Sequence, residues 1–587
     1  MQTFKRTVYC GKVSEKFLEK EISLCGWVQK RRDHGELIFI DLRDRTGIVQ
    51  LVFKPEIGKK ELEIAKTIRP ESVLFVKGVV TNRSEGAINE KLKTGNFEVH
   101  IQDFKILNMS EPLPFQLEDA EKVEEELRLK YRYLDLRRTK MHDVLKLRND
   151  VIFAIRQHLH KEDFYEIETP ILSKSTPEGA RDFLVPSRLN PGSFYALPQS
   201  PQIYKQLLMA AGLEKYFQVA RCFRDEDFRS NRQPEFTQLD LEMSFATEED
   251  VKKTTEDIIK TVWDKTINYK IDSIPSMTYQ EAFSSYGTDK PDLRFELKIN
   301  DITKFFENTE VKFLKSVVES NGKIGAICIP DKKFSRTELD KLTTFAIKEL
   351  KAKGLLYIRF TEDGLPDSAI SKFLDKDFLD QITKLIPQTN KESTLFLIAG
   401  DHKNAWTSLG KLREEFGKTL NLIDKNKFAF SWITDFPLFD WHPEDKRWYS
   451  THHPFTQPSD DIEKTELKNV KSKAYDLVCN GEELGGGSIR IYNPKLQEKI
   501  FEILGIEKKE AKEKFGFLLE AQKLGFPPHG GLALGLDRII MTLAKVDSIR
   551  DVIAFPKTNS GYCPMMQTPS TVDEKQLKDL YIKSIKK

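Results

Sequence analysis

Residues 236–245 alternate between polar and apolar side chains, and this alternation predicts a β-strand with two chemically different faces. The apolar face suits a hydrophobic core and consists of Leu239, Leu241, Met243 and Phe245. The opposite face consists of Phe236, Gln238, Asp240 and Glu242. The pattern therefore predicts a sheet that packs on one side and presents an aromatic ring and carboxylates on the other.

The preceding stretch, FRDEDFR at 223–229, predicts a first strand that is joined to this one by a polar turn. Arg224 and Glu226 share one parity in that strand, so we expect their side chains on the same face. An ordinary surface sheet favours long, mixed and mobile polar residues. A row that combines an arginine, an aromatic ring and several carboxylates instead predicts a face that holds a ligand.

Length and charge limit the classes of protein that this chain can form. Its 587 residues predict about three or four domains. The net charge of +2 arises from 93 basic and 91 acidic residues, so any nucleic acid must be bound by a local patch. The six cysteines form no CxxC pair, and no apolar run is long enough to span a bilayer. We therefore expect a cytoplasmic protein without a membrane segment.

The first hundred residues predict a small β-barrel with one polar, outward face. In LIFIDLRD, Ile38, Ile40 and Leu42 point inward, whereas Phe39 points outward among charged neighbours. Gln50 and Glu98 fall on the outward parity of two further strands. An exposed ring beside polar side chains suits base stacking on an OB-fold, although a stray exposed aromatic residue is the common alternative.

Changes in composition along the chain divide it into six parts. A breaker, SEPLP, precedes a charged segment at 117–134 that predicts a helix, and residues 290–425 are lysine-rich without a catalytic constellation. The predicted parts are a barrel at 1–107, a hinge at 108–135, a catalytic core at 136–289 and 426–560, an insertion at 290–425 and a C-terminal extension at 561–587.

Several short motifs carry side chains that could bind a ligand or a metal ion. Glu178 lies in a Pro/Gly loop, and Gln202 and Lys205 share one face of a predicted helix. Asp476 and Glu483 are hard oxygen ligands that suit Mg²⁺ carrying phosphates, and Gly485–Gly487 would let a ligand approach the backbone. Each motif alone also has an ordinary structural explanation as a solvated charge, a surface acid pair or a β-bulge.

Together these motifs resemble those of class II aminoacyl-tRNA synthetases. FRDEDFRSNRQPEFTQLDLE is similar to motif 2, GLALGLDR to motif 3, and EIETPIL, with Pro170, to motif 1. The loops TPEGARDF and QSPQIYKQ, with HHPFT, resemble the bacterial-type aspartyl-tRNA synthetase family. The resemblance runs nearly end to end. It implies an α+β multidomain protein with an N-terminal OB-fold barrel, an antiparallel catalytic sheet and an α/β insertion domain, assembled as a homodimer.

The resemblance also implies an ATP site and a metal site. It places Arg224 on the α-phosphate and on the substrate carboxylate, Glu226 and Gln233 at the adenine, and the purine between Phe236 and Arg538. Arg224 and Arg538 are the implied catalytic residues. The remaining implied ATP-binding residues are Glu483, Gly535, Leu536 and Asp537, and Asp476 and Glu483 would hold Mg²⁺.

The implied amino-acid substrate is L-aspartate, a small dianion with one ammonium group. Lys205 and Arg490 would pair its side-chain carboxylate, with His452 nearby, and Arg224 its α-carboxylate. The residues implied at the ammonium end are Glu178, Gln202 and Asp240. Asparagine has the same shape without the charge and would leave two buried cations unpaired, at a cost of roughly 2–5 kcal/mol.

By the same resemblance, the barrel binds the tRNA anticodon. Phe39 would stack on a base, Gln50 and Glu98 would bond base edges, and Lys30, Arg31 and Arg32 would meet phosphates. At two barrel positions, His34 and Gly86, the chain resembles those family members that aspartylate tRNA(Asn) as well as tRNA(Asp).

Three alternatives remain open at this point. They are an enzyme restricted to tRNA(Asp), an asparaginyl-tRNA synthetase, which Lys205 and the length of the insertion oppose, and a paralogue that no longer charges tRNA.

Overall fold

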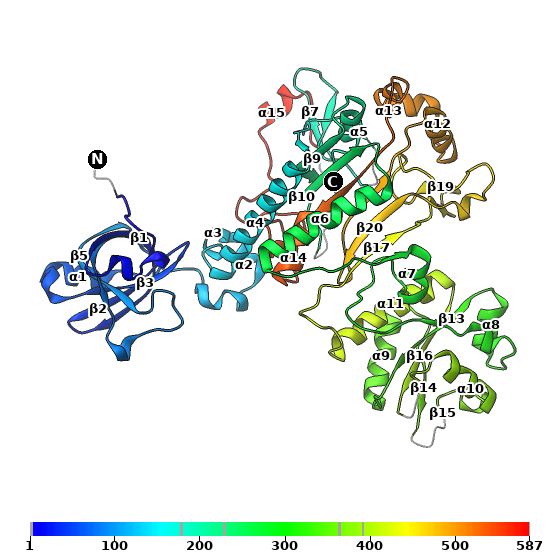
Figure 1. Ribbon diagram of the computed structural model, residues 1–587, viewed down its shortest axis with the longest axis horizontal. Helices are drawn as coiled ribbons and strands as arrows, with labels where there is room; N and C mark the ends of the chain where they lie inside the picture. The colour runs from blue at the N-terminus through cyan, green and yellow to red at the C-terminus, as the bar shows by residue number, and fades with distance from the viewer. Residues whose placement is uncertain (1–3, 177–179, 227–230, 362–365, 390–391, 586–587) are drawn as a thin grey trace. The chain divides into compact units, whose positions relative to one another are not determined.

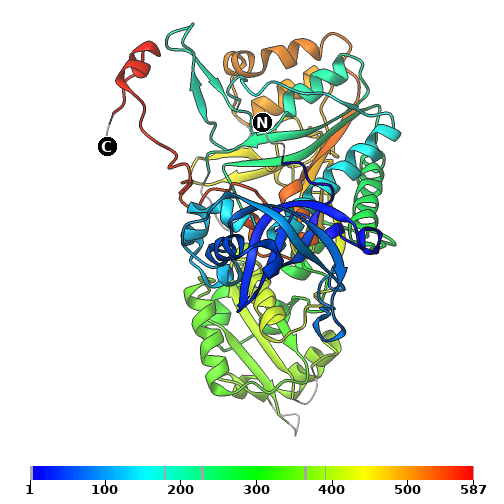
Figure 2. The same ribbon diagram turned by 90° about the vertical axis from the view of Figure 1, so that its left-hand side faces the viewer.

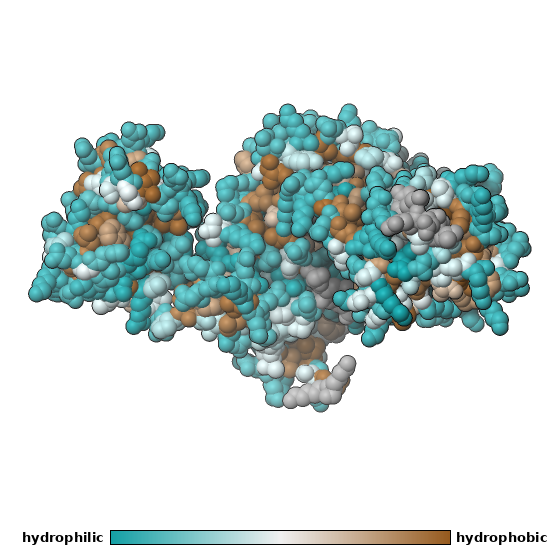
Figure 3. All heavy atoms as spheres, turned by 90° about the horizontal axis from the view of Figure 1, so that it is seen from below, coloured by the Kyte–Doolittle hydropathy of each residue, from teal (hydrophilic) through white to brown (hydrophobic). Residues whose placement is uncertain are grey.

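The computed structural model describes residues 4–176, 180–226, 231–361, 366–389 and 392–585 (Figure 1). The chain divides into two compact units, Met1–His142 and Asp143–Lys587. In the described part of the chain, no helix has the length and apolar character that a membrane crossing needs. The face drawn in Figure 3 is mostly hydrophilic, with hydrophobic residues in separate small patches.

The first unit contains a closed barrel in the order β1-β2-β3-β5-β4. Its elements are β1 (Glu21–His34), β2 (Leu37–Asp44), β3 (Gly47–Phe53), α1 (Lys59–Thr67), β4 (Val73–Asn82) and β5 (Phe97–Asn108). The predicted parity holds, because Ile38, Ile40 and Leu42 are fully buried in the barrel core and Phe39 is half-buried on the outside.

The segment that follows the barrel does not form the single charged helix that its composition predicts. It contains a 3-10 turn at Leu117–Lys122 and two short helices, α2 (Glu125–Lys130) and α3 (Arg132–Asp135). The apolar side chains of this segment gather with Phe115 into one small cluster, which includes Leu117, Ala120 and Leu134. Tertiary packing of these few apolar residues therefore overrides the local helical preference.

The second unit is built on an eight-stranded sheet in the order β11-β17-β20-β21-β22-β10-β9-β6. Its strands are β6 (Tyr165–Glu166), β9 (Lys215–Phe223), β10 (Glu235–Ser244), β11 (Ser276–Thr278), β17 (Phe430–Thr434), β20 (Ala474–Cys479), β21 (Glu482–Ile489) and β22 (His529–Gly535). All neighbouring pairs are antiparallel except the edge pairs β6–β9 and β11–β17.

The apolar face of this sheet packs against α4 (Thr139–Lys161), α6 (Glu248–Ile267) and α14 (Leu536–Ala544) (Figure 1). Leu239 and Leu241 of β10 are fully buried in this core, as their alternation predicts. Phe245 is an exception, because β10 ends at Ser244 and a left-handed backbone at Phe245 turns its ring, 70% exposed, away from the core. The prediction that Phe245 is a core residue is therefore wrong.

A second sheet lies within the insertion, in the order β12-β13-β16-β14-β15. The insertion contains β12 (Asn300–Asp301), α8 (Lys312–Glu319), β13 (Lys323–Ile329), α9 (Arg336–Lys348), β14 (Leu356–Phe360), β15 (Pro366–Asp367), α10 (Lys376–Leu385), β16 (Thr394–Gly400) and α11 (His402–Thr419), and α7 (Tyr279–Tyr286) comes just before it. Arg413 of α11 is buried and donates to the carbonyls of Asp292, Phe295 and Leu297, which secures the entry of the insertion.

The remaining elements flank the large sheet. They are the hairpin β7 (Leu184–Pro186) and β8 (Phe194–Ala196), α5 (Gln202–Ala210), the hairpin β18 (Phe439–His442) and β19 (Arg447–Ser450), α12 (Pro494–Ile503), α13 (Lys508–Ala521) and α15 (Glu574–Asp579). Figure 2 shows the C-terminal segment running out in extended form to α15. The barrel, the largely antiparallel sheet and the insertion with its own sheet confirm the predicted fold class.

Candidate functional site

The polar face of β10 forms one wall of a cavity of about 540 Å³. Phe236, Gln238 and Asp240 line it from β10, and side chains from the start of α5, from β20, β21 and β22, and from the segment after β9 complete it. The volume lies in the ordinary range for small-molecule sites. The two-faced strand that the sequence predicts therefore separates a hydrophobic core from a ligand cavity.

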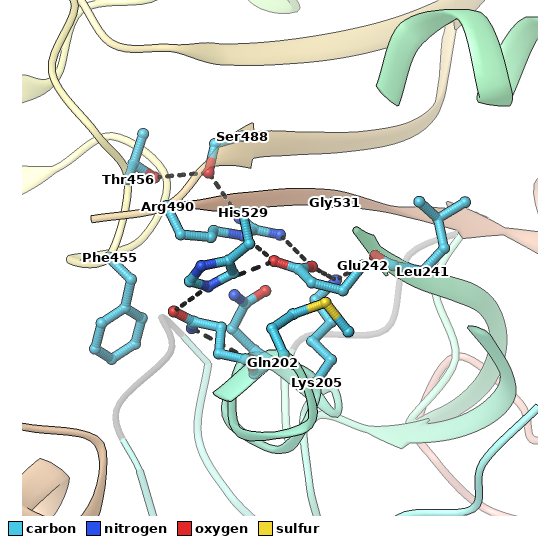
Figure 4. A network of polar contacts seen from close by, with 12 residues as sticks. Gln202, Lys205, Leu241, Glu242, Phe455, Thr456, Ser488, Arg490, His529 and Gly531 are labelled. Atoms are coloured by element: carbon cyan, nitrogen blue, oxygen red, sulfur yellow. Dashed lines mark hydrogen bonds and ion pairs between the residues drawn. The ribbon is translucent and has the colours of Figure 1, made fainter. Parts of the chain in front are cut away.

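A buried charge network forms the floor of this cavity (Figure 4). Lys205 Nζ lies 2.9 Å from Asp240 Oδ1 and 3.2 Å from Glu242 Oε2. Arg490 donates to Glu242 Oε1 at 2.9 Å and to Glu242 Oε2 at 3.3 Å. All four side chains are at most 2% exposed, so two cations and two carboxylates share one buried site.

The two carboxylates of this network have pKa values that are shifted in opposite directions. Burial tends to raise the pKa of Glu242, but Arg490 and Lys205 more than offset it and lower that pKa to about 2. Burial raises the pKa of Asp240, and the attraction of Lys205 does not fully compensate. Glu242 is therefore the fixed counter-charge of the two cations, and Asp240 is the carboxylate whose surroundings stabilise its charge less.

Two glycines make room for carboxylates at the cavity, those of Glu242 and Asp476. A Cβ atom on Gly531 would lie 1.9 Å from Glu242 Oε2, and one on Gly486 would lie 2.1 Å from Asp476 Oδ1. Cβ atoms on Gly485 and Gly487 would instead collide with backbone carbonyl oxygens of β22, at 2.2 and 2.0 Å. Within the glycine run, close strand pairing thus explains two positions, and clearance above a cavity carboxylate explains the third.

Arg224, the predicted catalytic arginine, lines the cavity one residue beyond the end of β9. Its guanidinium carbon lies 5.0 Å from the centre of the Phe236 ring, and its buried Nε has no hydrogen-bond partner among the described residues. Glu226 also lies beyond the strand, where Arg232 donates to it at 2.6 Å. The first strand is therefore shorter than predicted, although Arg224 N still bonds Pro234 O at 2.9 Å.

Three predicted ATP-binding residues have other partners in the structure. The Gln233 amide exchanges two hydrogen bonds, of 2.9 and 2.8 Å, with the backbone of Lys557 and so holds the C-terminal segment beside the cavity. Asp537 accepts from Arg148 at 2.5 Å and from Thr237 N at 2.9 Å, so its carboxylate joins α4 to β10. Leu536 is fully buried in the hydrophobic core, so only its backbone could contact ATP, and its place in the ATP site stays a prediction.

Gly535 and Arg538 line the cavity at the start of α14. Arg538 donates to Glu483 O at 2.7 Å and lies 3.6 Å from Glu483 Oε2, which ties motif 3 to β21. Glu483 is therefore in direct contact with Arg538, the second predicted catalytic arginine.

Two adjacent histidines line the cavity, and the sequence predicts a role only for the first, His452. His452, expected beside Lys205 and Arg490, lies 3.8 Å from Asp476 Oδ1. His453 contacts Arg490 instead, with 2.6 Å between Nε2 and the guanidinium. Burial and then the positive charge of Arg490 keep the pKa of His453 well below its usual value, so His453 is neutral. Sequence parity could not distinguish these neighbours because they lie in a loop.

Unpaired polar atoms converge on the cavity. Among the described residues, buried atoms without a hydrogen-bond partner include Gln202 Nε2, Arg224 Nε, Asn231 Oδ1, Asp240 Oδ2 and His452 Nδ1, and all five residues line it. Folded proteins rarely leave such groups unsatisfied, so we expect a polar ligand or ordered water to meet them. The predicted substrate residue Glu178 lies outside the described residues.

On the barrel, the predicted anticodon residues share one polar row. Gln50 donates to Glu98 at 3.0 Å, and His100 lies 2.8 Å from the other Glu98 oxygen. Arg32, expected to meet phosphates, instead lies 2.8 Å from Asp41 and donates to Gln50 at 3.2 Å. Arg32 therefore contacts the polar row, and its expected contact with phosphates stays a prediction.

A closed barrel followed by an antiparallel sheet with a charged cavity on its polar face defines the architecture of a class II synthetase. The tRNA synthetases class II (D, K and N) family matches residues 124–559, and the OB-fold nucleic acid binding domain family matches residues 22–107. The chain belongs to the class II tRNA synthetases of the D, K and N type. It is a ligase that uses ATP as a substrate.

Similar proteins span the whole chain. An aspartate–tRNA ligase of Macrococcus caseolyticus is 50% identical over 585 residues, covering 98% of each chain. An aspartate–tRNA(Asp/Asn) ligase of Thermodesulfovibrio yellowstonii is 49% identical over 595 residues, covering 98% of this chain and 99% of the relative. The crystal structure of asparaginyl-tRNA synthetase from Pyrococcus horikoshii has a TM-score of 0.60 at 21% identity, with 94% and 98% of the two chains covered, and supports the fold alone.

Proposed function

We propose that this enzyme activates L-aspartate with ATP and transfers it to tRNA(Asp), and also to tRNA(Asn). The single observation that carries the aspartate assignment is the pair of buried cations, Lys205 and Arg490, at the floor of the cavity. The similar ligases from Macrococcus and Thermodesulfovibrio, whose names specify aspartate, support it.

Charge explains the selection of aspartate over asparagine. The side-chain carboxylate of aspartate would join Glu242 and Asp240 around Lys205 and Arg490. The amide of asparagine supplies no charge and would leave the buried cations less well compensated, which costs roughly 2–5 kcal/mol. The unpaired Oδ2 of Asp240 would accept from the ammonium group of the substrate, and the unpaired Nε2 of Gln202 would donate to a water that bridges to this end of the substrate.

The first reaction needs no nucleophile from the protein. The α-carboxylate of aspartate attacks the α-phosphorus of ATP, a new oxygen–phosphorus bond forms, and the bond to pyrophosphate breaks. Arg224 would hold both reacting groups and stabilise the charge that develops at phosphorus, with Arg538 at the purine and the adenine on Phe236. The 3′-terminal hydroxyl of the tRNA then attacks the aspartyl-adenylate.

Asp476 and Glu483 suit a Mg²⁺ ion that arrives with the phosphates of ATP. The described residues contain no cluster of three or more metal-ligating side chains. Two carboxylates beside a phosphate site are nevertheless what Mg²⁺ ordinarily uses. Burial raises the pKa of Asp476 to about 6, and Gly486 leaves its oxygen uncovered. When bound, the ion would offset the negative charge of the phosphates.

The barrel would recognise the anticodon through Phe39, Gln50 and Glu98. At Gly86 the backbone does not need a positive φ, and a Cβ there would have nothing within 4 Å, so the fold would accept a larger side chain. Its small size is consistent with the broader tRNA specificity. A glycine that the fold does not require leaves open space at the barrel surface. His34 is exposed at the end of β1, and its ring lies 5.6 Å from that of Phe39.

A homodimer in the cytoplasm completes the proposal. Motif 1 and the helix before it expose large apolar side chains: Phe153 at 59%, Tyr165 at 61% and Leu172 at 53%. Such residues on neighbouring elements suit an interface between two copies.

The deciding experiment measures ATP–pyrophosphate exchange with aspartate, asparagine or no amino acid, each with and without tRNA. We expect exchange with aspartate in either condition and little with asparagine. Exchange that depends on asparagine, or that requires tRNA, would overturn the proposal.

A further inference from the structure

A second cavity, of about 270 Å³, lies in the barrel unit where the first described residues meet β1 and β2. Its lining includes Arg6, Tyr9, Trp27, Arg43, Arg45 and Arg137. We refer to it as the Tyr9 cavity. None of these residues belongs to the catalytic site or to the predicted anticodon set.

Three cations surround the ring of Tyr9. Arg6 lies 4.7 Å from the ring centre, Arg45 5.4 Å and Lys12 5.7 Å. Arg6 is 3.5 Å from Asp44, whose oxygens already accept from the backbone of Cys10 at 2.7 Å and of Thr46 at 2.8 Å. Within the described residues, no carboxylate oxygen lies within 4 Å of Arg45 or Lys12.

The other side of the cavity repeats this excess of positive charge. Arg137 lies over the Trp27 ring at 5.6 Å. Arg43 and Arg137 share one buried carboxylate, Glu71, at 2.8 and 2.9 Å. Four arginines and Asp44 thus line the cavity, with Lys12 beside the Tyr9 ring and Glu71 behind two of the arginines, so the excess of positive charge attracts an anion.

The Tyr9 cavity continues the strip of barrel surface that carries the predicted anticodon residues. Phe39, Asp41 and Arg43 alternate on the outward side of β2, and Trp27 pairs with Arg43 across β1. Phe39 and Arg43 are four residues apart on one strand, which corresponds to about 13 Å. An RNA strand whose base stacks on Phe39 would reach the cavity within a few nucleotides.

We propose that the Tyr9 cavity binds the sugar–phosphate backbone of the tRNA beside the anticodon, with Arg45 and Lys12 on phosphates and the Tyr9 and Trp27 rings available to a base or ribose. This inference rests on the proposed function. Cations beside aromatic faces, continuous with a base-stacking surface, match the chemistry of a single RNA strand better than that of a small free anion.

The test uses the full-length enzyme and a tRNA(Asp) transcript in filter binding across a series of salt concentrations. Combining Arg45→Gln with Lys12→Gln removes two exposed charges that form no ion pair with any of the described residues. We expect the Kd to rise at least fivefold. The slope of log K against log salt should become shallower by about 0.7–0.9 for each lost phosphate contact.

Lys105→Gln is the matched control, because Lys105 is an exposed barrel cation that lies 5.0 Å from the centre of the Phe4 ring. It should leave both the Kd and the salt slope unchanged. Aspartate-dependent pyrophosphate exchange without tRNA should be normal in all variants. A hairpin RNA of the anticodon stem and loop should lose affinity by the same factor as the full transcript.

The outcomes separate this inference from the proposed function. A wild-type enzyme that neither exchanges pyrophosphate with aspartate nor charges tRNA refutes the proposed function. If the wild-type enzyme does both but the double variant keeps its Kd and slope, or Lys105→Gln causes an equal loss, the Tyr9 cavity does not bind RNA. A loss confined to the full transcript would overturn the placement beside the anticodon.

Discussion

Glu242→Gln is the substitution that tests the buried charge network most directly. Glutamine has nearly the same shape as glutamate, so the change creates no cavity and removes one negative charge. In the native site Glu242 balances Arg490 at 2.9 Å and Lys205 at 3.2 Å. After the substitution, two fully buried cations would face Asp240 alone.

The expected loss of stability follows from the pKa of Glu242, which is about 2 compared with an ordinary value of 4.5. That difference corresponds to about 3 kcal/mol in favour of the ionised form. Removal of one partner from a buried ion pair typically costs about 3–5 kcal/mol of folding free energy, and the value from the pKa lies at the lower end of that range. For a unit of this size, a loss of about 3–5 kcal/mol should lower the midpoint of thermal unfolding at pH 7 by roughly 3–5 °C.

The pH dependence gives the effect a recognisable form. Because the folded-state pKa of Glu242 is lowered, its stabilisation is complete above pH 4.5 and is lost as the pH falls towards 2. The difference between wild type and variant should therefore be largest near neutral pH and should shrink in acid. L-Aspartate should restore part of the lost stability by supplying a carboxylate, whereas L-asparagine should not.

Glu249→Gln serves as the control, since Glu249 is 79% exposed and its partner Lys252 keeps a second carboxylate, that of Glu248, at 3.3 Å. Thermal unfolding followed by intrinsic fluorescence, at a series of pH values with and without each amino acid, measures all these quantities. A variant whose midpoint stays within 1 °C of wild type at pH 7, with the same acid profile, would refute the assigned role of Glu242.

Three further predictions follow from the proposed roles. Arg224→Ala should reduce aspartate-dependent pyrophosphate exchange at least about 100-fold, because it removes the charge at the reacting phosphorus, and near-normal exchange would contradict this role. Phe39→Ala should weaken aminoacylation by about 1–3 kcal/mol and spare exchange, whereas equal damage to both reactions would mean that Phe39 is structural. Wild-type enzyme should aspartylate tRNA(Asn) transcript well above a non-cognate control, and His34→Leu with Gly86→Lys should reduce that activity selectively. No difference from the control would rule out charging of tRNA(Asn).

The periodic parts of this protein could be predicted from its sequence. Alternation along a strand follows directly from backbone geometry, so the inward Leu239 and Leu241 and the outward Phe39 were evident before any tertiary contact was known. The motifs also indicated which segments surround the cavity. Each motif is a short contiguous segment, so it can be identified in the sequence without knowing the course of the loops that separate it from the next. Local pattern therefore determined the barrel, the two-faced sheet and the set of cavity segments.

Only the tertiary structure decided which groups pair with one another. Asp537 meets Arg148 across 389 residues, Glu242 meets Arg490 across 248, and His453 rather than its neighbour reaches that same arginine. Phe245 leaves the core because a left-handed turn interrupts its strand one residue early. Charge pairing and strand ends depend on distances between remote segments, and those distances exist only once the sheet, its helices and its loops have packed together.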